Sequence, residues 1–188
     1  ENVTFPDNKL HLELIKDFFL LACYTGLRYS DISALTPENI TDTGNGLELY
    51  LKAQKTKKPY HQNLRKLFPC SGGGASRPER VVQRRIAFHR DFYGKHPFYD
   101  EELLFQGMSN QYVNRELKTI AAMLEVRPLV KQQISIHSGR HTFGTIMAGK
   151  VPIQILQQLM QHSKLKETMI YVHLNRKAVE LALDKIEW

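Results

Sequence analysis

Apolar residues recur at helical spacing through most of this 188-residue chain, and they alternate as in a β-strand in one short stretch. Residues 9–24 carry such a helical stripe, and Gly26 is placed to end the helix. A second short helix is expected at 31–35, where Ser30 or Asp31 can serve as its N-cap. The same periodicity predicts further helices at 79–92, 110–125, 138–148, 152–160, 166–173 and 176–187.

The alternating stretch is LELYLKA at 47–53, which places Leu47, Leu49 and Leu51 on one side of a strand. A DTGNG turn precedes it, and the glycine-rich stretch at 70–78 is expected to be a flexible loop. We therefore expect a single mainly α domain with one small antiparallel β-sheet near residues 40–65, an α+β fold.

The composition excludes several classes of protein. With 42% hydrophobic and 24% charged residues, the chain is typical of a soluble globular domain. No apolar run is long enough to span a membrane, and the first residues do not resemble a signal peptide. Cys23 and Cys70 form no C-x-x-C pair, which argues against a disulfide framework and a structural zinc site. We expect a reduced, cytoplasmic domain that needs no metal or cofactor and has no membrane partner.

Positive charge is concentrated in two segments. The chain has 26 Lys plus Arg against 19 Asp plus Glu, a formal net charge of +7. Residues 52–66 contain six Lys or Arg and no acidic residue, and residues 77–95 contain six against Glu79 and Asp91. Such a distribution favours a surface that faces the phosphates of a nucleic acid, although a solvated surface would also account for it.

The stretch HSGRHTFGT at 137–145 places three side chains that are or can become cationic on one helical face. His137, Arg140 and His141 stand at positions i, i+3 and i+4. They would repel each other unless an anion lies between them. A zinc site of the H-E-x-x-H type is excluded because Arg140 stands inside the triplet. The alternative is an incidental histidine-rich turn at the surface.

Three other stretches are candidates for function. Arg28 follows the helix-ending glycine in T-G-L-R, and K-T-K-K at 55–58 lies at the tip of the expected hairpin. The nine-residue step from His162 to Tyr171 allows a turn and a short helix, which can bring both side chains to one cleft. Taken singly, a solvated arginine, a solvated charge run and a core tyrosine are the ordinary interpretations.

Taken together and in this order, these stretches resemble the catalytic domain of the tyrosine recombinases, the phage-type integrases. Within that family, the motifs most resemble those of integrases of conjugative transposons and related mobile elements. The resemblance implies that residues 1–188 form the C-terminal catalytic domain, without the family's N-terminal core-binding domain. It rests on TGLRYSDISAL (25–35), QKTKKP (54–59), HSGRHTFGT (137–145) and MQHSKLKETMIYVHL (160–174).

The resemblance also implies roles for individual residues. Arg28 and Arg140 match the two catalytic arginines, and His137 matches the histidine three residues before the second. His162 matches the later His/Trp position, and Tyr171 matches the nucleophile. Gly139 stands where the family usually has leucine, a departure expected to affect core packing and no chemistry.

The hairpin lysine is less well defined. Lys55 is the best match to the family's strand-turn lysine, but PYHQNLRKL is polar where the family has an apolar strand. The register of the hairpin therefore stays open, and Lys57 or Lys58 could be the catalytic lysine instead. Otherwise Lys57, Lys58 and His141 are expected to contact DNA, with His141 also supporting Arg140.

The implied reaction is attack of Tyr171 on a DNA phosphodiester to form a 3′-phosphotyrosyl link, without metal or ATP. His137 is the candidate base and Lys55 the candidate acid. The implied partners are double-stranded DNA and further copies of the chain in a tetrameric synapse, although an isolated fragment is expected to be monomeric. The alternatives are a type IB topoisomerase-like strand transferase and a catalytically silent DNA-binding module.

Overall fold

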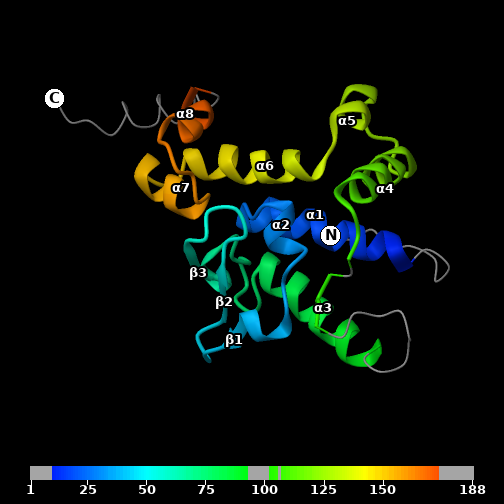
Figure 1. The fold of residues 1–188 in the computed structure, drawn as a ribbon, viewed down its shortest axis with the longest axis horizontal. Helices are drawn as coiled ribbons and strands as arrows, with labels where there is room; N and C mark the ends of the chain where they lie inside the picture. The colour runs from blue at the N-terminus through cyan, green and yellow to red at the C-terminus, as the bar shows by residue number, and fades with distance from the viewer. Residues whose placement is uncertain (1–9, 93–101, 106, 174–188) are drawn as a thin grey trace.

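Helix α1 (Leu10–Thr25) lies at the centre of the fold, with α6 (Ile136–Ala148) on one side and α3 (Arg77–Phe92) on the other (Figure 1). The computed structural model describes residues 10–92, 102–105 and 107–173. Helix α4 (Asn110–Met123) also packs against both α1 and α6. The shorter helices are α2 (Tyr29–Ile32), η2 (Pro37–Asn39), η3 (Leu64–Lys66), α5 (Pro128–Gln133), α7 (Ile153–Leu159) and α8 (Lys166–His173).

The core surrounds α1 because this helix buries an apolar stripe against the elements that enclose it. Phe18 is fully buried and stacks edge-on against Phe105, with ring centroids 5.1 Å apart. Phe143 brings α6 into the same cluster. Burial of an aromatic or aliphatic side chain of this size contributes about 1.5–3 kcal/mol. The stripe on α1 comprises Leu12, Ile15, Phe18, Leu21 and Ala22.

The sheet has three antiparallel strands in the order β1 (Ile40–Asp42), β2 (Leu47–Lys52) and β3 (Pro59–Asn63). The expected small sheet near residues 40–65 is therefore confirmed. The polar segment PYHQN forms β3 because Tyr60 and Gln62 point into the protein. Tyr60 pairs with Leu51 in the register, and its hydroxyl donates a hydrogen bond of 3.0 Å to the Thr25 carbonyl oxygen. That bond ties the hairpin to the end of α1.

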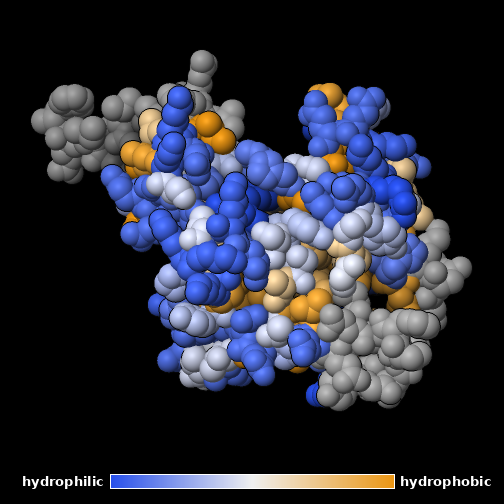
Figure 2. Space-filling model, viewed as in Figure 1, coloured by the Kyte–Doolittle hydropathy of each residue, from blue (hydrophilic) through white to orange (hydrophobic). Residues whose placement is uncertain are grey.

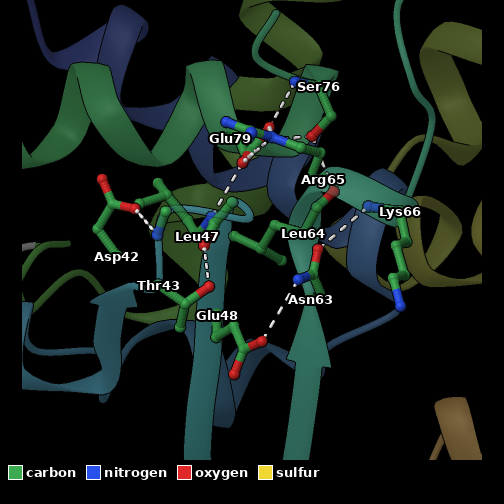
Figure 3. A network of polar contacts seen from close by, with 12 residues as sticks. Asp42, Thr43, Leu47, Glu48, Asn63, Leu64, Arg65, Lys66, Ser76 and Glu79 are labelled. Carbon is green, nitrogen blue, oxygen red and sulfur yellow. Dashed lines mark hydrogen bonds and ion pairs between the residues drawn. The ribbon is translucent and has the colours of Figure 1, made fainter.

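A buried carboxylate joins the sheet to α3. Glu79 accepts hydrogen bonds from the backbone N–H groups of Ser76 at 2.7 Å and Leu47 at 2.9 Å, and from Arg65 Nε at 3.2 Å (Figure 3). Burial alone would raise the pKa of Glu79, but these donors together hold it below its ordinary value. Gly46 has a φ of +120°, and a Cβ there would lie 2.6 Å from Arg65 Cβ, so only glycine fits.

Several boundaries differ from the sequence prediction for identifiable reasons. Helix α3 begins at Arg77 rather than 79 because Ser76 and Glu79 form a capping box. The short second helix spans 29–32 instead of 31–35, with Arg28 as its N-cap. Helix α5, opened by Pro128, was not predicted. The expected helix at 176–187 lies outside the described residues.

The basic segment 77–95 is used differently from the sequence prediction. Arg84 and Arg85 each place Nε 2.9 Å from a carboxylate oxygen of Asp17, which is fully buried on α1. These ion pairs fasten α3 to α1. Arg85, which is 3% exposed, therefore does not face phosphates as its segment was predicted to do.

Polar residues cover most of the face shown in Figure 2, with apolar patches near α5 and α8. Leu129 and Val130 are exposed on α5, and Leu165 and Ile170 are exposed at α8. Within the described residues, no helix has the length and apolar character that crossing a membrane requires.

Candidate active site

One face of α6 carries most of the candidate site. Ser135 caps the helix, since its hydroxyl accepts from Ser138 N and the Ser138 hydroxyl accepts from Ser135 N. The cap starts the helix at Ile136, which places His137 and His141 one turn apart with Gly144 one further turn along. The rings of the two histidines contact each other edge to face, with centroids 4.4 Å apart.

Arg140 is buried between α6 and the loop that follows α1. Its guanidinium donates to the carbonyl oxygens of Gly26 and Met160, and the residue is 4% exposed. Gly26 has a φ of +70°, and a Cβ there would lie 2.5 Å from the Phe143 ring. Glycine therefore lets the loop approach α6 closely enough to hold the arginine. Burial, followed by the charge of Arg28, lowers the pKa of Arg140 to about 10.

Arg28 is held from two sides. Its Nη2 donates to the Gln161 carbonyl oxygen at 3.0 Å, and its Nη1 lies 4.0 Å from a carboxylate oxygen of Asp31. Asp31 is 2% exposed and also accepts a 2.8 Å hydrogen bond from the backbone N–H of Gln54. This carboxylate therefore links Arg28 to the turn that carries Lys55. The sequence analysis treated Asp31 only as a possible helix cap; its spacing of three residues after Arg28 was the available signal.

A pocket of about 410 Å³ brings four predicted site residues together: Arg28, Lys55, His137 and Arg140. Of the three candidate lysines, Lys55 is the one that lines this pocket. Lys58 instead lines a second pocket of about 580 Å³ between β3 and α7, and Lys57 lines neither of these two. Lys55 therefore shares a pocket with both arginines and His137, whereas Lys58 shares one with His162.

Tyr171 lies on α8 against the far end of the same α6 face. Its hydroxyl is 2.9 Å from His141 Nδ1, and the residue is 2% exposed. The ring rests on Gly144, where a Cβ would approach two ring carbons to 2.6 Å. Burial raises the pKa of Tyr171, and the charge of Arg140 opposes that rise. The sequence analysis placed His141 beside Arg140 as a support; the hydrogen bond that it forms is to Tyr171.

His162 lies parallel to the Tyr171 ring, with centroids 6.2 Å apart. A hydrogen bond of 2.9 Å joins its Nδ1 to the hydroxyl of the fully buried Thr168. Gln157 holds the backbone, since its carbonyl accepts from His162 N at 3.0 Å and its side chain donates to His162 O at 3.3 Å. Burial, followed by the charge of Arg140, lowers the pKa of His162 to about 4. Neither Thr168 nor Gln157 was predicted from the sequence as a site residue.

The site is an electrostatically repulsive cluster of cationic and neutral basic groups. Burial lowers the pKa of His137, and the nearby His141, Arg140 and Arg28 lower it further. A cluster in which each basic group disfavours the charge of the next is stabilised when an anion binds among them. The described residues contain no group of three or more His, Cys, Asp or Glu that could hold a metal ion.

The comparisons with a family model and with known sequences agree on one protein family. The model of the phage integrase family matches residues 4–178. Tyrosine recombinase XerC of Mannheimia succiniciproducens is 23% identical over 152 residues, which cover 80% of this chain and 46% of that protein. XerC of Histophilus somni is 20% identical over 162 residues, which cover 86% and 49%. The chain thus spans about half the length of the curated relatives it matches.

Solved structures show the same fold. The XerH site-specific recombinase bound to its difH substrate superposes with a TM-score of 0.65 at 16% identity, over 98% of this chain and 48% of that one. The Tn1549 transposon integrase in complex with transposon right end DNA gives 0.60 at 17% identity, over 98% and 66%. The expected tyrosine recombinase catalytic-domain fold is confirmed. Because the family model covers nearly all of its residues, the chain belongs to the phage integrase family.

Proposed function

We propose that this chain is the catalytic domain of a site-specific DNA recombinase that cleaves and rejoins DNA through a 3′-phosphotyrosyl intermediate. The observation that carries the proposal is the pocket shared by Arg28, Lys55, His137 and Arg140, at the end of the α6 face on which Tyr171 rests. Family membership supports the class of reaction. The solved neighbours bound to DNA support double-stranded DNA as the partner.

The two arginines suit one phosphate. A phosphodiester gains negative charge on its non-bridging oxygens in the transition state, and planar guanidinium groups offer forked donors to those oxygens. Arg28 and Arg140 are each held in place by main-chain carbonyl oxygens, which fixes their orientation before substrate binds. The carbonyl partners carry no net charge and leave the charge of Arg140 available to a phosphate. Arg28 also lies 4.0 Å from the buried carboxylate of Asp31, which orients it and offsets part of its charge.

The proposed reaction is a balanced exchange of esters. The Tyr171 oxygen gives up its proton to a base, for which His137 is the candidate from the sequence, and forms a bond to phosphorus. The bond from phosphorus to the 5′-oxygen breaks. The 5′-oxygen takes a proton from Lys55, which lines the phosphate pocket from the β2–β3 turn. His162, whose ring lies parallel to the tyrosine ring, is proposed to contact the phosphate. The phosphotyrosyl bond retains the energy of the phosphodiester, so a second 5′-hydroxyl reseals the strand without ATP or a metal.

Strand exchange also requires an assembly. Four tyrosines must meet in one synapse on two duplexes, so we propose a tetramer of this chain on DNA and a monomer without it. A cytoplasmic location remains a prediction from the sequence.

Covalent trapping tests the proposal. A nicked, radiolabelled duplex with a randomised core is incubated with the protein, and products are separated in SDS. We expect an SDS-stable adduct that Tyr171→Phe abolishes while DNA binding is retained, and that the control Tyr112→Phe leaves unchanged. An adduct that persists in Tyr171→Phe would refute the assignment. DNA binding by the unaltered chain without any adduct would favour a silent DNA-binding module, and relaxation of supercoiled DNA without strand exchange would favour a topoisomerase.

A further inference from the structure

The hydroxyl of Tyr171 lies against a histidine that the sequence did not assign to proton transfer. The oxygen is 2.9 Å from His141 Nδ1, a normal hydrogen-bond distance. His137, the base candidate from the sequence, lines the phosphate pocket one turn earlier on α6. Tyr171 does not line that pocket, and the His141 ring lies in contact with both the His137 ring and the Tyr171 hydroxyl.

The position of Tyr171 is a specific packed contact. Its ring rests on Gly144, where any Cβ would overlap the ring. Tyr171 is only 2% exposed, so its contact with His141 is part of the packed interior and not a contact between two mobile surface side chains. Helix α8 packs against both α6 and α7, which fixes the direction from which the hydroxyl approaches. The segment 137–145 thus supplies both Gly144, on which the ring packs, and His141, whose Nδ1 forms a hydrogen bond with the hydroxyl.

Before the reaction, Tyr171 is in the form that donates a proton and His141 is in the form that accepts one. The pKa shifts themselves do not favour the transfer, which must accompany bond formation to phosphorus. Burial, followed by the charge of Arg140, lowers the pKa of His141, so its ring is neutral at neutral pH and one nitrogen can accept. Burial keeps the Tyr171 hydroxyl protonated, so this hydroxyl donates. The other titratable or charged groups around His141 are His137 and Arg140 on α6 and His162 before α8.

We propose that His141 is a catalytic residue that accepts the proton of Tyr171 as the bond from the tyrosine oxygen to phosphorus forms. The inference rests on the proposed function. The Tyr171 proton moves to His141 Nδ1 while the departing 5′-oxygen takes its proton from Lys55. On rejoining, His141 returns the proton to the tyrosine oxygen as the 5′-hydroxyl attacks. Arg140 lies between the two halves of the site, because it lines the phosphate pocket and its charge acts on Tyr171.

Single-turnover cleavage of the nicked duplex by the full chain tests this role. A general base contributes about 10²–10⁴ in rate, so His141→Ala should slow adduct formation by at least 10² near neutral pH. The matched control is Thr142→Ala, which alters an exposed neighbour on the same helix and should leave the rate unchanged. His141→Gln, which is closer in size to histidine, repeats the test if the alanine variant fails to fold.

Two substitutions in the reactants separate a base from a packing residue. Fluorotyrosine at position 171 has a more acidic phenol, so it should restore much of the rate lost in His141→Ala. A duplex with sulfur at the 5′-bridging position has a leaving group that needs no proton. It should rescue Lys55→Ala and leave the defect of His141→Ala in place.

The contrary results are equally distinct. A His141→Ala protein that cleaves as fast as the unaltered chain, or faster, would overturn the inference; a faster variant would show that the hydrogen bond restrains the nucleophile instead. Failure of fluorotyrosine to rescue would also overturn it, while leaving the proposed function intact. Absence of any adduct from the unaltered chain would overturn the proposed function, and this inference with it.

Discussion

Helices α3 and α6 lie on opposite sides of α1 (Figure 1), and the arginines near each helix differ in the groups that hold them. On the α3 side, Arg84 and Arg85 form ion pairs with the buried carboxylate of Asp17. On the α6 side, Arg140 donates to two main-chain carbonyl oxygens, and Arg28 donates to one and lies 4.0 Å from the buried carboxylate of Asp31. A carboxylate in direct contact offsets the charge of a guanidinium, whereas a carbonyl oxygen orients it and leaves its charge in place, as at Arg140.

The difference teaches that the density of basic residues along a sequence does not locate a phosphate-binding surface. The segment 77–95 has as many Lys and Arg residues as the segment 52–66, yet two of its arginines serve to hold α3 against α1. On the α6 side, the pKa of Arg140 is lowered to about 10 and the pKa of His162 to about 4. Burial is the main cause in both cases, and the positive charge of a nearby arginine is the second. A bound anion would stabilise the positively charged forms of these two groups.

The largest effect is expected on the α3 side, and on stability. Asp17→Ala leaves Arg85, which is 3% exposed, without its carboxylate. Removing one partner of a buried pair costs about 3–5 kcal/mol of unfolding free energy. Glu13→Ala, which breaks the pair with Lys16 near the surface of the same helix, should cost under about 1 kcal/mol. Urea unfolding measures both; equal costs would mean that the Asp17 cluster is not structural.

The next effect is expected on the α6 side, and on catalysis. Lysine lacks the planar fork of arginine, so Arg28→Lys and Arg140→Lys should each slow adduct formation by about 10²–10³. Arg84→Lys keeps a cation beside Asp17 and should cleave at nearly the rate of the unaltered chain. Single-turnover rates on the nicked duplex provide the measurement. Full activity with lysine at position 28 or 140 would mean that the arginines near α6 are no more important for cleavage than those on α3.

A smaller effect follows from His162. Its pKa lies below the ordinary value of about 6.5. Between pH 6.5 and 4 the unfolded chain therefore binds a proton that the folded chain does not. Its contribution to stability is complete above pH 6.5 and is lost as the pH falls towards 4. Between pH 7 and 5 we expect His162→Gln to lose less unfolding free energy than the unaltered chain, by on the order of 1 kcal/mol. Identical losses in urea unfolding would place His162 in a solvated setting.

The smallest effect concerns the salt dependence of DNA binding. The slope of log affinity against log salt is about −0.9 for each phosphate neutralised. Changing Lys57 and Lys58 together to alanine should flatten this slope by roughly one to two units. Arg84→Ala, on the side where the charge is already paired, should leave it unchanged. The reverse pattern would place the phosphate-binding surface on α3.

Periodicity and turn residues were enough to predict most helices and the small sheet, because those features depend on local pattern. They were insufficient for α5, whose six residues are too few to show a period. They also left open whether PYHQN was a strand, because its pairing with β2 depends on Tyr60 reaching the end of α1.

The candidate site was predictable in its residue types and only partly in its contacts. The family resemblance named Arg28, His137 and Arg140, and the structure brings them together with Lys55 in one pocket. The contact of His141 with Tyr171 depends on how α8 packs on α6, which no local pattern reveals. The ion pairs of Asp17 with the α3 arginines likewise join residues far apart in the sequence.

A methylphosphonate at the scissile position tests most directly whether the positive charge beside α6 serves the charge of a phosphodiester. Replacing one non-bridging oxygen with methyl makes the linkage neutral, so an arginine has less charge to stabilise in the transition state. On an ordinary phosphodiester, Arg140→Ala should slow adduct formation by at least about 10². On the methylphosphonate, the same substitution should cost less than about tenfold. An Arg140→Ala penalty that is equal on the two substrates would contradict the account.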